Sequence, residues 1–386
     1  MKRIMGASSN IEYCIPQRLR DARIADGKTI KEVAEALGIS AQVLSMFELG
    51  RCKVSVEMFF RLKNMYSMPN SFYGTQYMDN VARSTVFFRK FSAATKRKRE
   101  QALKRADFIS CNIIKFFGGK IKFPEVDGLF DEIKTSVNIE KKRDPELWAK
   151  LIRRKWNMGM GPISNLIRDL ERRGIIVVVM PMDNDVDGFS YWQDGRPFIF
   201  VNKNNTAVRL RMSIAHELCH LFFHEEEDIE RELKRVEDEA KAFAGAFLLP
   251  EVALHNELYM GSLEQFRYLK SKWRISINGI IMRAKQLFLI DDNRYTYLQT
   301  QISRKKWRKI EPEDDVIEQE QPVLLSQAIR LFIDDGIMTR DEMIEEIGLS
   351  GRFIESHCSL PNGYFDRVHN NLVHMDFKGH KKNQRN

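Results

Sequence analysis

The segment His216-Glu217-Leu218-Cys219-His220 places two histidines four residues apart, with a glutamate directly after the first. On an α-helix, side chains four residues apart lie about one turn apart on the same face. Two imidazoles in that arrangement can supply two of the three protein ligands of a catalytic zinc ion, which leaves one position open for water. The glutamate then lies beside that water and can act as its general base. The spacing therefore predicts a hydrolytic zinc site with His216 and His220 as metal ligands and Glu217 as the catalytic residue.

The residues around this segment favour a buried helix. At about 100° per residue, His216, Glu217, His220 and His224 fall in one wedge of roughly 100°, and the rest of the helix surface is apolar. Burying such polar groups is unfavourable unless they find partners, and a metal ion provides one. We therefore prefer a metal site to a chance match on a surface helix.

A third metal ligand must come from elsewhere. His224 lies one further turn along the same helix, about 6 Å on by helical rise, so it can hardly close a tetrahedron with the first two histidines. We expect it to support the site from outside or to lie in the core. The next predicted helix spans residues 230–249, and Glu237 lies at the edge of its apolar face, whereas Asp238 and Glu239 point elsewhere. Glu237 is therefore the carboxylate best placed to reach the two histidines.

The two segments together resemble the ImmA/IrrE-type metallopeptidases. RLRMSIAHELCHLFFH and the downstream VEDEAKAFAGAFLLP follow that family's pattern, which is H-E-x-x-H and then E-x-x-A-x-x-F-A with L-x-P. The similarity extends from Trp148 to about Pro361. It implies an α+β zincin-like metallopeptidase domain with a small sheet, a zinc cofactor (Zn2+), and substrates among transcriptional repressors. The family's site residues carry over as the metal ligands His216, His220 and Glu237 and the catalytic base Glu217.

Near the start of the chain, two short helices are predicted on either side of a turn. Thr29 can cap the first helix, Gly38 can end it, and Ser40 can cap the second. This geometry resembles the Cro/phage-repressor class of helix-turn-helix domains, whose second helix enters the major groove. At the position of Ile30, members of that class often carry a glutamine that braces the contact with a DNA phosphate. The alternative is a helical module that only mediates assembly. The residues that we predict to contact DNA are Ser40, Gln42, Ser45, Arg51 and Lys53.

The net charge of +9 is distributed unevenly along the chain. Residues 83–105 hold nine Lys and Arg residues against one acid, whereas residues 216–239 hold ten acids against three bases. The basic stretch could follow DNA phosphates beside the helix-turn-helix. Alternatively, it could be a solvated face that packs on the acidic middle of the chain. We favour the second interpretation slightly, because charged runs usually face water.

The remaining features bound the class of protein. We see no apolar run long enough to span a bilayer and no signal peptide, and the five cysteines are odd in number and scattered. We therefore expect a cytoplasmic protein with reduced thiols that makes no use of a membrane. The fold class that we predict is multidomain and mainly α. Its parts are a helix-turn-helix domain (1–68), a basic helical linker (69–145), the metallopeptidase domain (146–302), and a C-terminal helical region with a disordered tail (303–386).

Within that last part, residues 303–322 are expected to form a polar connector, and two capped helices follow that faintly resemble another helix-turn-helix. Residues 334–346 hold six acids against one base, which is unfavourable for DNA binding. We interpret this pair as a packing or partner-sensing unit.

These observations lead to two functional hypotheses. The first is a zinc-dependent endopeptidase that acts on a repressor or other regulatory protein and binds DNA through its N-terminal domain. The alternative is a non-enzymatic transcriptional regulator or antitoxin that keeps the peptidase fold as a sensor. The intact set of the ligands His216, His220 and Glu237 and the base Glu217 favours the enzyme, because a scaffold has no need of a catalytic base. We expect a homodimer, because helix-turn-helix domains usually read paired half-sites.

Overall fold

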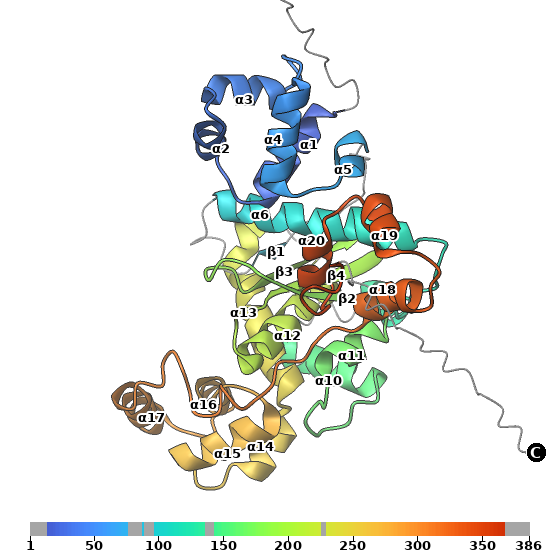
Figure 1. The fold of residues 1–386 in the computed structure, drawn as a ribbon. Helices are drawn as coiled ribbons and strands as arrows, with labels where there is room; N and C mark the ends of the chain where they lie inside the picture. Colours follow the sequence, from blue (N-terminus) through green and yellow to red (C-terminus); the bar gives the residue numbers. More distant parts are fainter. Residues whose placement is uncertain (1–13, 76–86, 89–95, 136–142, 225–228, 367–386) are drawn as a thin grey trace, which may run out of the picture.

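The computed structural model describes residues 14–75, 87–88, 96–135, 143–224 and 229–366. Within these residues the chain is mainly helical, with one small mixed sheet. The N-terminal helices lie at one end of the molecule, the sheet lies near the middle, and a group of helices from residues 251–304 lies at the opposite end (Figure 1). This arrangement confirms the multidomain, mainly α fold class.

The N-terminal helices form where the caps in the sequence place them. They are α1 (Pro16–Ala25), α2 (Ile30–Leu37), α3 (Ala41–Glu48), α4 (Val56–Tyr66) and α5 (Asn70–Gly74). Thr29 and Glu32 form a reciprocal capping box at the start of α2, and Gly38 ends that helix with a φ of 68°. Ser40 then caps α3. The predicted helix, turn and second helix are therefore all present.

The sheet contains β1 (Phe87–Phe88), β2 (Ile176–Met180), β3 (Gly188–Gln193) and β4 (Arg196–Asn202) in the order β1-β3-β4-β2. The strands β3 and β4 form an antiparallel hairpin, and β2 pairs in parallel with β4. Side chains alternate between the two faces of the sheet. Ile176, Val178 and Met180 therefore enter one hydrophobic core, and Val177 and Val179 enter the other.

The first of these cores joins distant parts of the chain. It combines one face of the sheet with α1–α5, with residues 102–117 and with the C-terminal helices. The second core lies on the other face, against α8 (Leu129–Thr135), α10 (Pro145–Lys155), α11 (Leu166–Glu171), α12 (Ala207–Phe223) and α13 (Ile229–Leu248). The helices α14 (Glu251–Glu257), α15 (Leu263–Trp273), α16 (Ile277–Gln286) and α17 (Asp292–Arg304) extend this second core. The domain boundaries drawn from the sequence stay a prediction.

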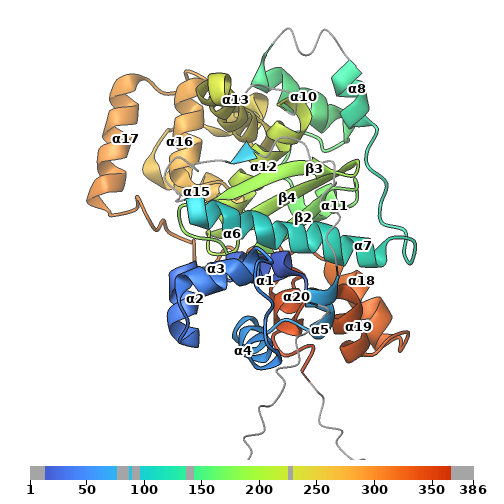
Figure 2. The same ribbon diagram turned by 90° about the horizontal axis from the view of Figure 1, so that it is seen from above.

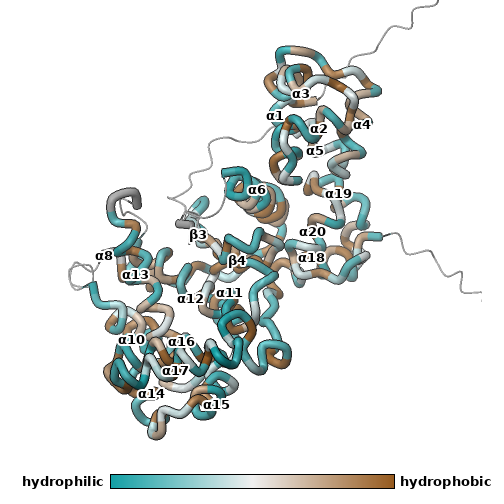
Figure 3. The backbone as a smooth tube through the Cα atoms, turned by 90° about the vertical axis from the view of Figure 1, so that its left-hand side faces the viewer, coloured by the Kyte–Doolittle hydropathy of each residue, from teal (hydrophilic) through white to brown (hydrophobic). Residues whose placement is uncertain are grey.

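A long helix lies between the helix-turn-helix and the sheet (Figures 1 and 2). It consists of α6 (Lys96–Asp107), a π-helical stretch η1 (Phe108–Ile113) and α7 (Ile114–Phe117). The sequence KRKRE at its start is charged and IIKFF at its end is mostly apolar, and both hydrophilic and hydrophobic residues are visible in it at the label α6 in Figure 3. Arg105 donates hydrogen bonds to the carbonyl oxygens of Ala25, at 2.8 Å, and Pro181, at 3.2 Å. One side chain of this helix thus connects α1 with the end of β2.

The described part of the basic stretch packs on acidic groups. Lys98 Nζ lies 2.7 Å from Asp183 Oδ1 and 3.1 Å from Asp185 Oδ2, and Lys104 Nζ lies 3.0 Å from Asp21 Oδ1. This agrees with the packing interpretation in kind. The acids, however, lie on α1 and after β2, and not in residues 216–239, because α6 crosses the opposite face of the sheet from α12.

The predicted connector after α17 is anchored by two buried acids. The carboxylate of Glu311 accepts hydrogen bonds from Lys270 Nζ and from the first backbone N–H groups of α16, at 2.7 and 3.0 Å. Glu320 pairs with the buried Arg211 and accepts a hydrogen bond from the backbone of Ile167 at 2.9 Å. These carboxylates satisfy helix N-termini from outside, so the connector holds the helices of the second core together.

The C-terminal helices are α18 (Leu324–Asp334), α19 (Arg340–Ile347) and α20 (Gly351–His357). Thr339 and Glu342 form a capping box, Gly348 has a φ of 73°, and Ser350 caps α20. These three features repeat, at the same spacing, those at α2 and α3. The turn between α19 and α20 therefore has the local geometry of a helix-turn-helix.

This second unit is engaged in packing. The carboxylate of Glu355 on α20 accepts hydrogen bonds from the backbone N–H groups of Gly363, at 3.0 Å, and Phe365, at 2.7 Å. Glu345 on α19 accepts one from the first residues of α5 at 3.3 Å. The outer face of α20 is thus partly covered by the chain that follows it, which agrees with a packing unit. Among the described residues, no helix is long and apolar enough to cross a membrane.

Candidate metal centre

The histidine-bearing helix α12 is the most deeply buried helix around the sheet. Thr206 caps its start, and α12 then passes between the sheet on one side and α13 on the other. His216, Glu217 and His220 each have an exposed fraction of 0%. The wedge of polar residues predicted from the sequence therefore exists in an apolar interior, where a polar group needs a specific partner.

The structure brings the three predicted metal ligands together. The two Nε2 atoms of His216 and His220 lie 3.0 Å apart. The carboxylate of Glu237 on α13 lies 3.6 Å from His216 Nε2 and 3.7 Å from His220 Nε2. A tetrahedral zinc ion with bonds of about 2.0–2.1 Å holds its ligand atoms about 3.3 Å from one another. The donor types and their separations thus fit a zinc ion.

Glu237 adds a carboxylate to the two imidazoles. Burial raises the pKa of the Glu237 carboxyl, but hydrogen bonds and charge interactions with His216 and His220 outweigh this effect and hold the pKa well below its usual range. Its side chain keeps 16% of its surface exposed, whereas those of the two histidines keep 0%. Among the three predicted ligand residues, Glu237 is therefore the one that faces solvent.

Glu217, the predicted base, is held by a residue that the sequence did not point to. Ser190 on β3 donates a hydrogen bond from its Oγ to Glu217 Oε2 at 2.8 Å, and both residues are fully buried. Alternation along β3 places Phe189 and Tyr191 in the first core and Ser190 on the side of α12. No local motif marks this serine, because its position depends on the register between strand and helix.

The edge of the sheet beside Glu217 is occupied by the chain itself. The strand β1 pairs antiparallel with β3, and Phe87 lies opposite Ser190 in this register. A backbone segment from the predicted linker therefore pairs directly with Ser190, the residue that holds Glu217.

The third histidine of α12 lies outside the metal-ligand group. His224 has an exposed fraction of 1%. Its Nδ1 lies 2.9 Å from His220 Nδ1, and its Nε2 lies 3.0 Å from Glu239 Oε2. His224 is thus a core residue that contacts a ligand, as expected. Glu239 on α13 also faces this cluster, contrary to expectation, because its carboxylate contacts His224 where α12 ends.

The five predicted DNA-contacting residues lie at the other end of the molecule, on the helix-turn-helix (Figure 1). Gln42 is exposed on α3, Ser45 is half-buried, and Arg51 and Lys53 are exposed just after that helix. Ser40 is exposed and also caps α3, accepting a hydrogen bond from the backbone of residue 43 at 3.2 Å. They stay predicted contacts.

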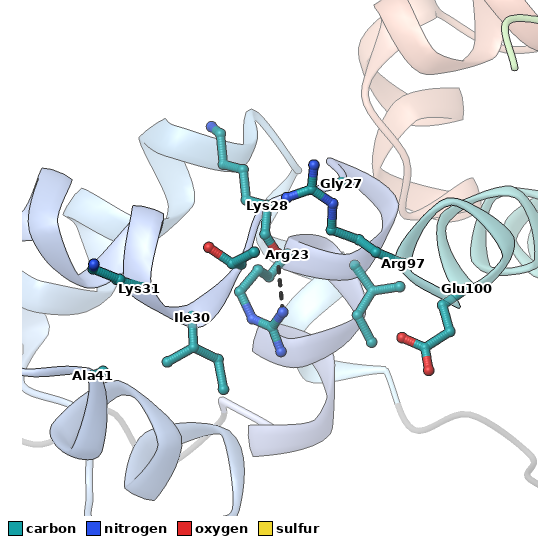
Figure 4. Close-up of a pocket in the computed structure, with 10 residues that line it drawn as sticks. Arg23, Gly27, Lys28, Ile30, Lys31, Ala41, Arg97 and Glu100 are labelled. Atoms are coloured by element: carbon teal, nitrogen blue, oxygen red, sulfur yellow. Dashed lines mark hydrogen bonds between the residues drawn. The ribbon is translucent and has the colours of Figure 1, made fainter. Parts of the chain in front are cut away.

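A groove of about 580 Å³ lies beside this surface, between the first turn of α2 and α6. Figure 4 shows Arg97 and Glu100 of α6 on one side of it and Lys28, Ile30 and Ala41 on the other. Its basic side chains have acidic partners: Arg23 with Glu48 at 2.6 Å, Lys28 with Asp26 at 2.7 Å, and Arg97 with Glu32 at 3.6 Å. We assign no ligand to this groove, because its described charges are balanced.

Comparison with known families agrees with both resemblances. A family model for the IrrE N-terminal-like domain, which is a peptidase family, matches residues 170–285, and a helix-turn-helix model matches residues 19–66. No characterised protein matched the chain. The predicted metal ligands and base lie within the first region, and the predicted DNA-contacting residues lie within the second. The chain therefore combines a helix-turn-helix domain of the Cro/C1 type with an IrrE N-terminal-like domain of the peptidase family.

Proposed function

We propose that this protein is a zinc-dependent endopeptidase that cleaves a transcriptional repressor or another regulatory protein and binds DNA through its N-terminal domain. The observation that carries the proposal is the convergence of His216, His220, Glu237 and Glu217 in one place in the interior, from the two consecutive helices α12 and α13. A non-enzymatic sensor would need neither a complete ligand set nor a base beside it.

The chemistry follows from the donor set. A zinc ion bound there would supply a Lewis acid for the water and the peptide carbonyl. The Glu217 carboxylate takes one proton from the attacking water, the water oxygen bonds to the carbonyl carbon, the C–N bond breaks, and Glu217 passes the proton to the leaving amine. Ser190 holds the carboxylate for this transfer through its hydrogen bond to Oε2.

The DNA-binding domain would bring the peptidase to particular sites on DNA. Since the helix-turn-helix and the peptidase-like domain share one chain, DNA binding would concentrate the peptidase near DNA-bound regulators. Self-cleavage is a further outcome that the same experiment detects. The α6 helix contacts both α1 and the end of β2, so it connects the helix-turn-helix with the sheet of the peptidase-like domain.

The test is a cleavage assay with the full-length chain. Purified zinc-loaded protein is incubated with repressors encoded beside it, and fragments are identified by mass spectrometry. We expect the wild type to cleave a partner and the Glu217→Gln variant, loaded with the same amount of zinc, to leave it intact. Equal cleavage by both proteins would refute the catalytic assignment. A zinc-free wild type that binds one DNA sequence tightly would favour the regulator hypothesis.

A further inference from the structure

His220 uses its two ring nitrogens for different contacts. Its Nε2 faces His216 Nε2, at 3.0 Å, and the carboxylate of Glu237, at 3.7 Å. Its Nδ1 points the opposite way, to His224 Nδ1 at 2.9 Å. A metal-binding histidine needs a partner for its second nitrogen, because that partner fixes the ring orientation and the tautomer. In this protein the partner is a second imidazole.

Hydrogen-bond chemistry allows one arrangement of protons along this row when His220 binds a metal through Nε2. A neutral His220 then carries its proton on Nδ1 and donates it to His224. His224 Nδ1 must accept, so the proton of His224 is on Nε2. That nitrogen lies 3.0 Å from Glu239 Oε2, which accepts the hydrogen bond. The carboxylate of Glu239 thus favours, in both histidines, the tautomers that metal binding at His220 Nε2 requires.

The outer end of the row is anchored. Arg235 NH1 donates to both carboxylate oxygens of Glu239 at 3.0 Å, and Arg143 NH1 lies 3.7 Å from Oε1. His224 is 1% exposed and makes an edge contact with the ring of Trp148, with centroids 6.0 Å apart. The backbone N–H of His224 also donates to the carbonyl of His220 at 3.1 Å. The row is therefore a fixed, buried feature and not a surface contact.

We propose that His224 and Glu239 are positioning residues that hold His220 in its ligating orientation and strengthen zinc binding. The inference rests on the proposed metal centre and gives a specific role to two residues outside the ligand set. Partners of this kind change metal affinity by about 10–100-fold when they are removed. We therefore expect His224→Phe and Glu239→Ala to weaken zinc binding by a factor in that range.

The variants separate this role from packing. The ring of His224→Phe can keep the contact with Trp148 but cannot accept the proton of His220. In His224→Asn the amide oxygen takes the place of Nδ1, so this conservative variant should regain part of the affinity. Asp238→Ala is the matched control for Glu239→Ala, since Asp238 is 61% exposed and pairs with Lys241 on the surface.

Three measurements on the full-length protein give the outcome. They are the zinc dissociation constant from competition with a chromophoric chelator, the visible absorption spectrum of the Co2+-loaded protein, and the thermal unfolding of the metal-free protein. We expect weaker zinc binding and an altered Co2+ spectrum for His224→Phe and Glu239→Ala, with unfolding close to that of the wild type. Asp238→Ala should behave as the wild type in all three.

Zinc binding by His224→Phe and Glu239→Ala that equals that of the wild type would overturn the inference and leave the metal centre intact. So would a loss of affinity in Asp238→Ala as large as that in Glu239→Ala. If His224→Phe does not fold, Glu239→Ala and its control decide the question. A wild type that binds no zinc would instead refute the proposed function itself, so the two failures are distinguishable.

Discussion

Replacing Ser190 by alanine should slow peptide cleavage without removing zinc. The Ser190 hydroxyl lies 2.8 Å from Glu217 Oε2, and neither residue has any exposed surface. No hydrogen bond from Ser190 to a metal ligand is present among the described contacts. The substitution therefore changes the group that holds the base and leaves the zinc ligands in place.

The size of the effect follows from the kind of hydrogen bond that is lost. A buried hydrogen bond to a charged group contributes about 1.5–3 kcal/mol. At about 1.36 kcal/mol for each factor of ten in rate, the loss corresponds to roughly a 10- to 150-fold decrease in kcat, if the bond is made fully in the transition state. Zinc stoichiometry should not change.

The assay compares kcat on a cleaved partner protein for the wild type, Ser190→Ala and Ser213→Ala. Ser213 is an apt control, because it is fully buried on α12 and its hydroxyl makes no hydrogen bond to any described residue. We expect Ser213→Ala to keep a kcat close to that of the wild type. A kcat of Ser190→Ala equal to that of Ser213→Ala would refute the role assigned to the serine.

Two further predictions concern stability and DNA binding. Burial lowers the pKa of His357 from 6.5 to about 3. Below pH 6.5 the unfolded state therefore takes up a proton that the folded state does not. The free energy of unfolding decreases as the pH falls from 6.5 toward 3, by about 2 kcal/mol between pH 7 and pH 5. His357→Phe should remove this loss in urea unfolding at the two pH values, and an unchanged loss would contradict the assignment. Arg51→Glu with Lys53→Glu should weaken DNA binding and reduce the slope of log K against log salt by about 2, because two phosphate contacts are lost. The control is Arg304→Glu with Lys309→Glu, which reverses two exposed charges outside the helix-turn-helix. This variant should leave the slope unchanged in the same binding titration.

The sequence predicted those features that depend on short-range geometry. His216 and His220 share a face because an α-helix repeats every 3.6 residues, and the capping residues Thr29 and Gly38 set the ends of α2. Glu237 was also found, because an angular count along one helix shows which carboxylate looks inward. In each case the decisive information lies within one helix or one turn.

The features that the sequence did not predict depend on how distant elements meet. Ser190 reaches Glu217 because β3 crosses beneath α12 in one particular register. Glu239 reaches His224 because α13 packs along α12 and brings this carboxylate to the end of that helix. Such relations require the tertiary structure.

The most direct test of the central claim is the zinc content of the purified protein, measured by mass spectrometry of the metal, in the wild type and in Glu237→Ala. Glu237 is the proposed ligand from the second helix, so its substitution tests whether α12 and α13 form one site. We predict one zinc ion per chain in the wild type and loss of most of it from Glu237→Ala after dialysis against a chelator. Zinc retained equally by both proteins, or absent from both, would contradict the proposed centre.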